Sequence, residues 1–117
     1  MNLFTLRVIE AIKKVPRGKV ATYQQIAGLA GKEHASRAVS WILNSSTKKH
    51  ALPWQRIVSK KGGVAFKPGT YHFRMQARLL KAEGVTVDPK TGAIDMKRFQ
   101  LKTRKKRSRR PTPKMFG

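Results

Sequence analysis

Apolar residues at the start of the chain recur with the period of an α-helix. Four of them fall at positions i, i+1, i+4 and i+7, on one face of a helix: Val8, Ile9, Ile12 and Val15. Residues 16–18 read Pro-Arg-Gly, which ends a helix because proline lacks a backbone donor and glycine favours turns. The pattern predicts an amphipathic helix over residues 1–14.

Two shorter helical segments follow. Thr22 and Gln25 have the Thr-x-x-Gln spacing of a capping box, in which each side chain accepts a hydrogen bond from the other residue's backbone N–H. Gly31 is a common helix stop. We therefore predict helices over residues 23–30 and 35–44, joined by a tight turn. Two short helices joined in this way are typical of a helix-turn-helix, whose second helix is the recognition helix.

The middle of the chain changes from a helical to a strand pattern. Residues 45–50 are polar and are expected to form a loop before a turn at Pro53. Residues 55–58 and 64–66 are short apolar runs separated by Ser-Lys-Lys-Gly-Gly, a turn-forming sequence. We expect the two runs to pair as a β-hairpin, the wing of a winged helix-turn-helix.

A fourth helix is predicted over residues 71–83, with Thr70 as its N-cap and Gly84 as its stop. Three residues would form its buried face: Phe73, Ala77 and Leu80. Residues 85–101 have no single period; they contain a turn at 88–92 and four residues expected to pack: Ile94, Met96, Phe99 and Leu101. The fold class is therefore mainly α with a small β-hairpin.

Charge separates the chain into a domain over residues 1–101 and a basic tail over 102–117. The formal net charge is +22, and eight of the 27 basic residues lie in the tail, which has no acid. The other 19 basic residues lie in the domain together with all five acids, so the domain itself carries a formal net charge of +14. Such a field attracts phosphate polyanions, and duplex nucleic acid is the leading partner. We predict that the tail is disordered and strengthens DNA binding in a salt-dependent way.

Several functional classes are excluded or disfavoured. The 117 residues contain no cysteine, so a cysteine nucleophile, disulfides and cysteine-ligated metals are ruled out. No apolar run approaches the roughly 20 residues that a membrane helix needs, and the N-terminus does not read as a signal peptide. We expect a monomeric cytoplasmic protein, associated with the nucleoid if bacterial, with no cofactor, metal or membrane partner.

Four sequence blocks resemble the DNA-binding domain of the O6-alkylguanine-DNA alkyltransferases, in the family's order and close to its spacing. They are Gly-Lys-Val-Ala-Thr-Tyr-Gln-Gln-Ile-Ala at 18–27, Ser-Arg-Ala-Val at 36–39, Pro-Trp-Gln-Arg at 53–56 and Leu-Leu-Lys-Ala-Glu-Gly at 79–84. In that family the third block reads Pro-Cys-His-Arg, and the cysteine accepts the alkyl group. Trp54 stands in its place here, so the chain resembles the non-enzymatic branch, the alkyltransferase-like proteins.

The resemblance implies how the protein would hold DNA. Arg37 matches the arginine that enters the base stack from the minor groove when a nucleotide is extruded. Small neighbouring residues would let the helix approach the floor of a groove about 6 Å wide. Tyr23 matches the tyrosine that presses on the phosphate beside the flipped nucleotide. The implied DNA-binding residues are Tyr23, Gln24, Ala35, Ser36, Arg37, Ala38, Ser40 and Trp41.

The family's alkyltransferases use a cysteine, a histidine and a glutamate for catalysis, and the resemblance implies that two of these three residues are replaced here. An indole at Trp54 cannot accept an alkyl group as a thiolate does. Gln55 matches the histidine that activates the cysteine, and an amide is no general base. Glu83 matches the glutamate that orients the histidine, and would bond Gln55 or act structurally, while Arg56 would brace the turn. We therefore expect no catalytic residue.

A pocket for the flipped base is expected around the Pro53 turn. Its implied lining is Tyr23, Leu43, Trp54, Ile57, Val64, Ala65, Phe66 and Lys67. Lys67 would place a cation near the base, although an exposed hairpin lysine would look the same in the sequence. Two residues depart from the family pattern: Trp41 is bulky where a small groove-facing residue is favoured, and Ser46 replaces an asparagine that braces the loop before the turn.

The function predicted from these observations is a damage sensor. It would bind O6-alkylguanine in double-stranded DNA by nucleotide flipping, without chemistry, and flag it for nucleotide excision repair proteins. One alternative is a helix-turn-helix regulator that reads undamaged sequence, although Ala35, Ala38 and Val39 are poor base readers. Another is a glycosylase that uses Glu83, for which the sequence shows no second catalytic group.

Overall fold

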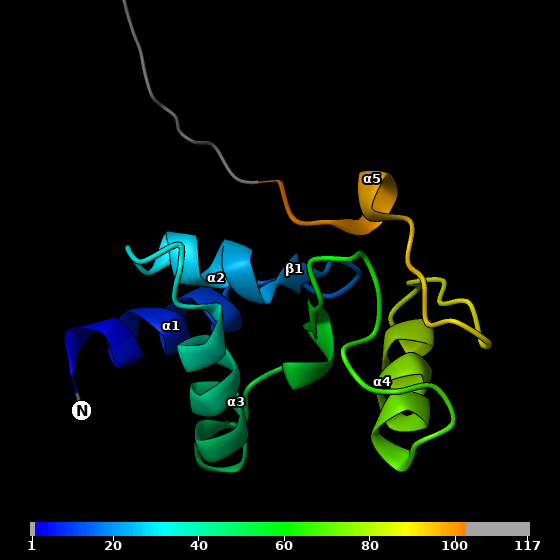
Figure 1. Ribbon diagram of the computed structural model, residues 1–117, viewed down its shortest axis with the longest axis horizontal. Helices are drawn as coiled ribbons and strands as arrows, with labels where there is room; N and C mark the ends of the chain where they lie inside the picture. The colour runs from blue at the N-terminus through cyan, green and yellow to red at the C-terminus, as the bar shows by residue number, and fades with distance from the viewer. Residues whose placement is uncertain (1, 103–117) are drawn as a thin grey trace, which may run out of the picture.

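The computed structural model describes residues 2–102. Its elements, in chain order (Figure 1), are α1 (Leu3–Lys13), β1 (Ala21–Thr22), α2 (Tyr23–Leu29), α3 (Ser36–His50), the 3₁₀ turn η1 (Trp54–Arg56), β2 (Ile57–Val58), α4 (Tyr71–Ala82) and α5 (Met96–Phe99). The predicted class, mainly helical with a small two-stranded sheet, is confirmed. Residues 103–117, which make up nearly all of the predicted disordered tail, lie outside the described part.

The amphipathic first helix is confirmed. Asn2 caps α1, because its side-chain oxygen accepts a hydrogen bond from the Thr5 N–H at 2.8 Å. The four apolar residues that predicted the helix are all buried in the larger of two cores: Val8, Ile9, Ile12 and Val15. They pack against α2, α3 and Ile57, so α1 supports the helix pair from behind.

The predicted capping box of α2 is also confirmed. The Gln25 N–H donates to Thr22 Oγ1 at 2.9 Å, and the Thr22 N–H donates to Gln25 Oε1 at 3.3 Å. Gly31 follows the helix with φ at +97°, a left-handed conformation that favours glycine. The capping box therefore determines where α2 begins, with Tyr23 as its first residue.

The third helix ends six residues later than predicted, and the expected polar loop at 45–50 is wrong. The Ser45 and Thr47 hydroxyls donate to carbonyls of the preceding turn, those of Ile42 and Leu43, so these residues stay in the helix. Ser46 is buried within α3, so it does not belong to a loop. The helix ends at Ala51, which has a left-handed φ of +52°.

The short strand after η1 pairs with a different partner from the one expected. β2 pairs in parallel with β1, with Ala21 opposite Ile57 and Thr22 opposite Val58. The expected hairpin between residues 55–58 and 64–66 does not form; only a single bridge joins Ser59 to Gly63. The physical reason is that the C-terminal segment occupies this edge, since the Val64 N–H donates to the Gly92 carbonyl at 2.9 Å.

The fourth helix begins as predicted and ends one residue earlier, at Ala82. Thr70 Oγ1 accepts a hydrogen bond from the Phe73 N–H at 3.3 Å, and Gly84 follows the helix with φ at +89°. Phe73 and Leu80 are buried as expected, whereas Ala77 is half-buried. The buried residue missed in the sequence is Gln76, which is 0% exposed.

Residues 85–101 close the fold as a strap over β1 and α4, as the upper part of Figure 1 shows. Ile94 and Phe99 join Val20, Val58, Leu80 and Val85 in a second, smaller core. The strap then runs beside Val20, whose N–H donates to the Phe99 carbonyl at 2.9 Å. No helix within residues 2–102 is long and apolar enough to cross a membrane.

Candidate nucleic-acid interface

The N-terminal end of α3 is open to solvent and positively charged. Ala35, its N-cap, has no side chain that could satisfy the first backbone N–H groups, and the first turn contains no acid. Arg37 is exposed, and the ion pairs within residues 2–102 are the Arg56–Glu83 pair and a loose His34–Glu33 contact. Unsatisfied N–H groups and an unpaired guanidinium at a helix N-terminus suit phosphate oxygens and other anions.

One face of α3 runs from this end toward the Pro53 turn. Arg37, Ser40, Trp41 and Asn44 are spaced i, i+3, i+4 and i+7, and therefore lie on one side of the helix. Trp41 is 71% exposed, while Val39 on the other side is fully buried in the core. The small residues Ala35, Ser36, Ala38 and Ser40 are each partly exposed. This face can approach a surface closely, except where Trp41 protrudes.

Tyr23 and Gln24 begin α2 on the neighbouring element. Gln24 is exposed, whereas Tyr23 is half-buried and packs against the main core. Burial raises the pKa of the Tyr23 phenol, so its hydroxyl stays protonated at neutral pH. Tyr23 can therefore donate a hydrogen bond to a phosphate oxygen while its ring forms a wall.

Trp54 is presented by η1, between α3 and α4 (Figure 1). Its indole is half-buried and contacts Phe66 edge to face, with the ring centroids 6.1 Å apart. Phe66 in turn stacks on His72 at 5.1 Å. Gln76 positions this turn from below, because its side-chain amide donates to the carbonyls of Gln55 and Ile57 at 2.9 and 3.0 Å.

These side chains line a cavity of about 390 Å³ that is open to solvent. Its lining is Tyr23, Leu43, Asn44, Thr47, Trp54, Phe66, Tyr71, His72, Met75 and Leu79. None of the chain's five acids lines it or lies in α3. The volume lies in the range of small-molecule sites, and the lining is mostly aromatic and aliphatic, so the cavity suits a flat ring with an apolar substituent.

The structure brings together four of the eight residues predicted for the pocket: Tyr23, Leu43, Trp54 and Phe66. The other four do not line the cavity. Ile57 is fully buried in the main core, Val64 is buried beside Gly92, and Ala65 and Lys67 are exposed. The role of Lys67 near a base stays a prediction.

Six lining residues were missed in the sequence: Asn44, Thr47, Tyr71, His72, Met75 and Leu79. Thr47 was missed because α3 was ended too early, whereas Asn44 lay within the predicted helix but was not assigned to the pocket. The other four lie at i, i+1, i+4 and i+8 of α4, on one helical face. That period was visible in the sequence, but only the fold shows that this face is turned toward Trp54.

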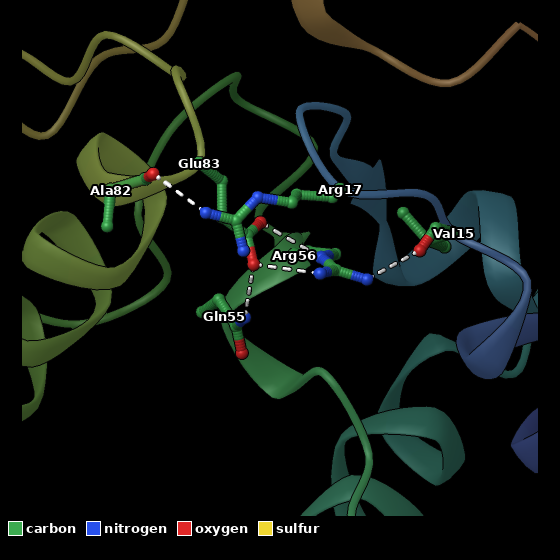
Figure 2. Close-up of polar contacts among 6 residues, drawn as sticks. All are labelled: Val15, Arg17, Gln55, Arg56, Ala82 and Glu83. Atoms are coloured by element: carbon green, nitrogen blue, oxygen red, sulfur yellow. Dashed lines mark hydrogen bonds and ion pairs between the residues drawn. The ribbon is translucent and has the colours of Figure 1, made fainter.

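The opposite side of the same turn is filled by a closed polar cluster, shown in Figure 2. Arg56 donates to both oxygens of Glu83, from Nε at 2.9 Å and from Nη2 at 2.8 Å. Its Nη1 donates to the Val15 carbonyl at 2.9 Å, and the Gln55 amide donates to Glu83 at 2.9 Å. Arg17 donates to the Ala82 carbonyl at the end of α4 at 3.1 Å.

Both expected roles of Glu83 are therefore present, since it bonds Gln55 and holds Arg56. The two hydrogen bonds from Arg56 hold the pKa of the Glu83 carboxyl below its usual range, against the opposing effect of burial. The same bonds raise the pKa of Arg56. The pair stays ionised at neutral pH and joins η1 to α4 and to the segment after α1. Within residues 2–102 no group of three or more His, Asp or Glu side chains could hold a metal ion.

The comparison with known families agrees with this geometry. Residues 3–85 match the family model of the 6-O-methylguanine DNA methyltransferase DNA-binding domain. The chain belongs to this family.

Individual proteins of this family are similar to the chain over most of its length. The chain is 35% identical, over 97 residues, to a protein of Escherichia coli (strain K12) named DNA base-flipping protein, covering 83% of this chain and 73% of the relative. It is 28% identical to alkyltransferase-like protein 1 of Schizosaccharomyces pombe, over 74% of this chain and 81% of that protein. The fold matches the crystal structure of S. pombe Atl1 in complex with DNA containing O6-carboxymethylguanine. The TM-score is 0.77 at 24% identity, with 88% of this chain and 98% of that chain covered.

Proposed function

We propose that this protein is a non-enzymatic sensor of O6-alkylguanine in double-stranded DNA. The observation that carries the proposal is the aromatic cavity beside α3, with Trp54 in the Pro-Trp-Gln-Arg block that resembles the family's Pro-Cys-His-Arg. A guanine that carries an alkyl group combines a flat ring with an apolar substituent, which is what this lining suits. The target nucleotide would rotate out of the duplex into the cavity.

Three residues would take part in rotating the nucleotide out of the duplex. Arg37 enters the base stack from α3 and stacks its guanidinium on the orphaned base, which recovers part of the few kcal/mol that flipping costs. Tyr23 donates to the phosphate beside the extruded nucleotide. Asn44 lies two turns along α3 from Arg37, about 10 Å along the axis, and already lines the cavity. One helix face therefore connects the intercalating residue with the site that receives the base.

The same turn explains why the lesion would leave unchanged. The chain has no cysteine, and the Trp54 indole is no alkyl acceptor. Gln55 offers an amide in place of a general base, and its N–H group is bonded to Glu83. The Glu83 side chain is 6% exposed and held by Arg56, so it is not free to activate water as a glycosylase would require.

The relatives support this function. One is named for base flipping, and another has been crystallised with DNA that contains O6-carboxymethylguanine. In the proposed sequence of events the protein binds as a monomer, holds the lesion exposed, and passes it to nucleotide excision repair proteins.

The decisive experiment is an equilibrium titration of two duplexes that differ only by O6-methylguanine in place of guanine, at a stated physiological salt concentration. We expect tighter binding of the modified duplex and recovery of the lesion chemically intact. Arg37→Ala should remove most of the preference, whereas Arg7→Ala, the loss of an equally exposed charge on α1, should weaken both duplexes alike. Equal affinity for the two duplexes would overturn the proposal.

A further inference from the structure

Exposed large apolar side chains gather in two places on the described part of the protein. Five are exposed: Leu3, Leu6, Leu29, Trp41 and Tyr71. Trp41 and Tyr71 belong to the candidate DNA interface and its cavity. The three leucines, which are 60%, 48% and 48% exposed, line one groove elsewhere. We call it the leucine groove; its lining is Leu3, Leu6, Arg7, Glu10, Ala11, Lys14, Leu29 and Leu101.

The groove arises because α1 carries exposed leucines on a second face, besides the face that is buried in the core. One face is buried in the core and was the signal that predicted the helix. The other carries Leu3, Leu6, Glu10 and Lys14, spaced close to i, i+3, i+7 and i+11. Exposed leucines one turn apart, as Leu3 and Leu6 are, form an apolar patch that another element can cover. Here the face meets only the edge of Leu29 and the end of the strap, which leaves a hollow of about 470 Å³.

The far wall of the groove is held firmly. Leu101 donates its N–H to the Val20 carbonyl at 2.6 Å and accepts a hydrogen bond from the Gln25 amide at 2.6 Å. Gln100 also donates to Gln25, at 2.9 Å. The strap that places Leu101 lies beyond residues 3–85, which the family model matches.

The charges around the groove are mainly positive. Arg7 and Lys14 line it together with a single acid, Glu10. Leu3 and Arg7 also line the adjoining hollow, where Lys32 lies over the Phe4 ring at 5.2 Å. The groove thus has an apolar floor and a basic border, and a ligand with the opposite charge pattern would complement it.

We propose that the leucine groove docks an amphipathic helix of another protein, with an apolar ridge on the four leucines and acidic side chains against Arg7 and Lys14. This is the recognition mode in which an amphipathic helix enters a groove through anchors spaced i, i+3 or i+4, and i+7. The border charges select an acidic partner.

Two other occupants fit the charges worse. A second copy of this chain would bring the same basic border and a net charge of +22 against its own. The chain's own residues 103–117 contain seven Lys or Arg and no acid, so their charge repels that of Arg7 and Lys14.

The leucine groove shares no lining residue with the Trp54 cavity. It is built by α1, the end of α2 and the strap, whereas the DNA-binding residues belong to α3 and the start of α2. A partner in the groove should therefore bind at the same time as DNA. This inference does not depend on lesion recognition, because any duplex that occupies the α3 face serves to test it.

The test uses a synthetic 18-residue helical peptide with leucines at i, i+3, i+4 and i+7 and glutamates beside them. It is titrated into the full-length protein already saturated with a fluorescein-labelled duplex, and leucine methyl signals are followed by NMR. Prior saturation matters because an acidic peptide also binds any basic surface. We expect shifts at Leu3, Leu6, Leu29 and Leu101, with the duplex still bound. Release of the duplex, or shifts confined to α3, would overturn the proposal.

Matched variants separate the groove from general attraction. Leu6→Gln with Leu29→Gln leaves the charge unchanged and should weaken peptide binding about tenfold or more, because two side chains would no longer bury apolar surface against the peptide. Arg7→Glu with Lys14→Glu should reverse the preference toward a peptide with lysines in place of glutamates. Lys90→Glu with Lys97→Glu, the same change of charge at exposed residues that line neither the groove nor the cavity, should leave the peptide preference unchanged. Unaltered peptide affinity in both groove variants would refute the docking site.

Discussion

The two sides of the Pro53 turn are opposite in character, although the residues of the turn that face them, Trp54 on one side and Gln55 and Arg56 on the other, are consecutive in sequence. Trp54 faces an open cavity without acidic side chains, where its ring contacts Phe66 edge to face. Gln55 and Arg56 face a closed cluster in which both oxygens of Glu83 are hydrogen-bonded. The closed side stabilises the fold, and the open side is available for a ligand. Gln55, Arg56 and Glu83 thus form a structural cluster, while the neighbouring surface has the shape of a binding site.

The largest expected effect is the loss of the buried ion pair. Glu83→Gln should lower the free energy of unfolding by about 3 kcal/mol, because Arg56 would remain largely buried without an anion. Lesion preference should persist once the variant is folded. Chemical denaturation measures the first and DNA titration the second. Glu33→Gln is the control, because that carboxylate is 72% exposed and 3.8 Å from His34, and the change should stay within about 0.5 kcal/mol. A Glu83→Gln protein as stable as its parent would show that the cluster contributes nothing.

The open side should respond in binding and little in stability. Trp54→Ala should weaken the O6-methylguanine duplex about tenfold, since stacking a base on an aromatic side chain contributes roughly 1–3 kcal/mol, and should leave the unmodified duplex unchanged. Trp41→Ala is the matched control, because Trp41 is exposed on α3 outside the cavity and should affect both duplexes equally. If the Trp54→Ala protein kept its full lesion preference, the indole would make no contribution to lesion binding.

The ion pair also predicts a dependence of stability on pH. The folded state holds the pKa of Glu83 below its ordinary value of 4.5, so the pair's contribution is complete above that value. It is lost as the pH falls through the lower pKa of the folded protein, because protonation removes the anion. Denaturation of the parent and Glu83→Gln proteins at decreasing pH should give free energies that converge. The exposed Asp88 also has a lowered pKa, but it is common to both proteins and cancels in the difference. A difference that is constant with pH would contradict the assignment.

The smallest effect is expected at Gln55. Gln55→Ala removes one hydrogen bond to Glu83, while the two from Arg56 remain. The free energy of unfolding should fall by about 1 kcal/mol, with unchanged lesion preference. If lesion preference fell without a loss of stability, the amide would belong to the open side of the turn.

Local patterns in the sequence predicted most of the helices well. The start of α2 followed from Thr22 and Gln25, and the start of α4 from Thr70, because a cap is formed by residues three apart. The end of α3 was predicted wrongly, since Ser45 and Thr47 bond within the helix when their neighbours are packed. The β1–β2 pairing joins two-residue strands 36 positions apart, and strands that short have no pattern that shows a partner.

The residues of the candidate site were likewise only partly predictable from the sequence. Trp54 and Arg37 could be singled out from short motifs, but half of the predicted pocket residues do not line the cavity. Val64 and Lys67 were placed in it by the resemblance to the family, whereas in the structure Val64 is buried and Lys67 is exposed. The face of α4 that does line the cavity is set by Gln76, a buried polar residue that the apolar pattern could not reveal.

The sequence by itself determined that this chain has no cysteine, is strongly basic, and carries tryptophan and glutamine at the Pro53 turn. Those properties depend on which residues are present and on neighbours a few positions apart. Only the tertiary structure decided that Glu83 pairs with Arg56, that α4 completes the cavity, and that Leu101 closes a groove with α1. These outcomes join residues from 27 to almost 100 positions apart, and such contacts form only when the whole chain packs its two cores.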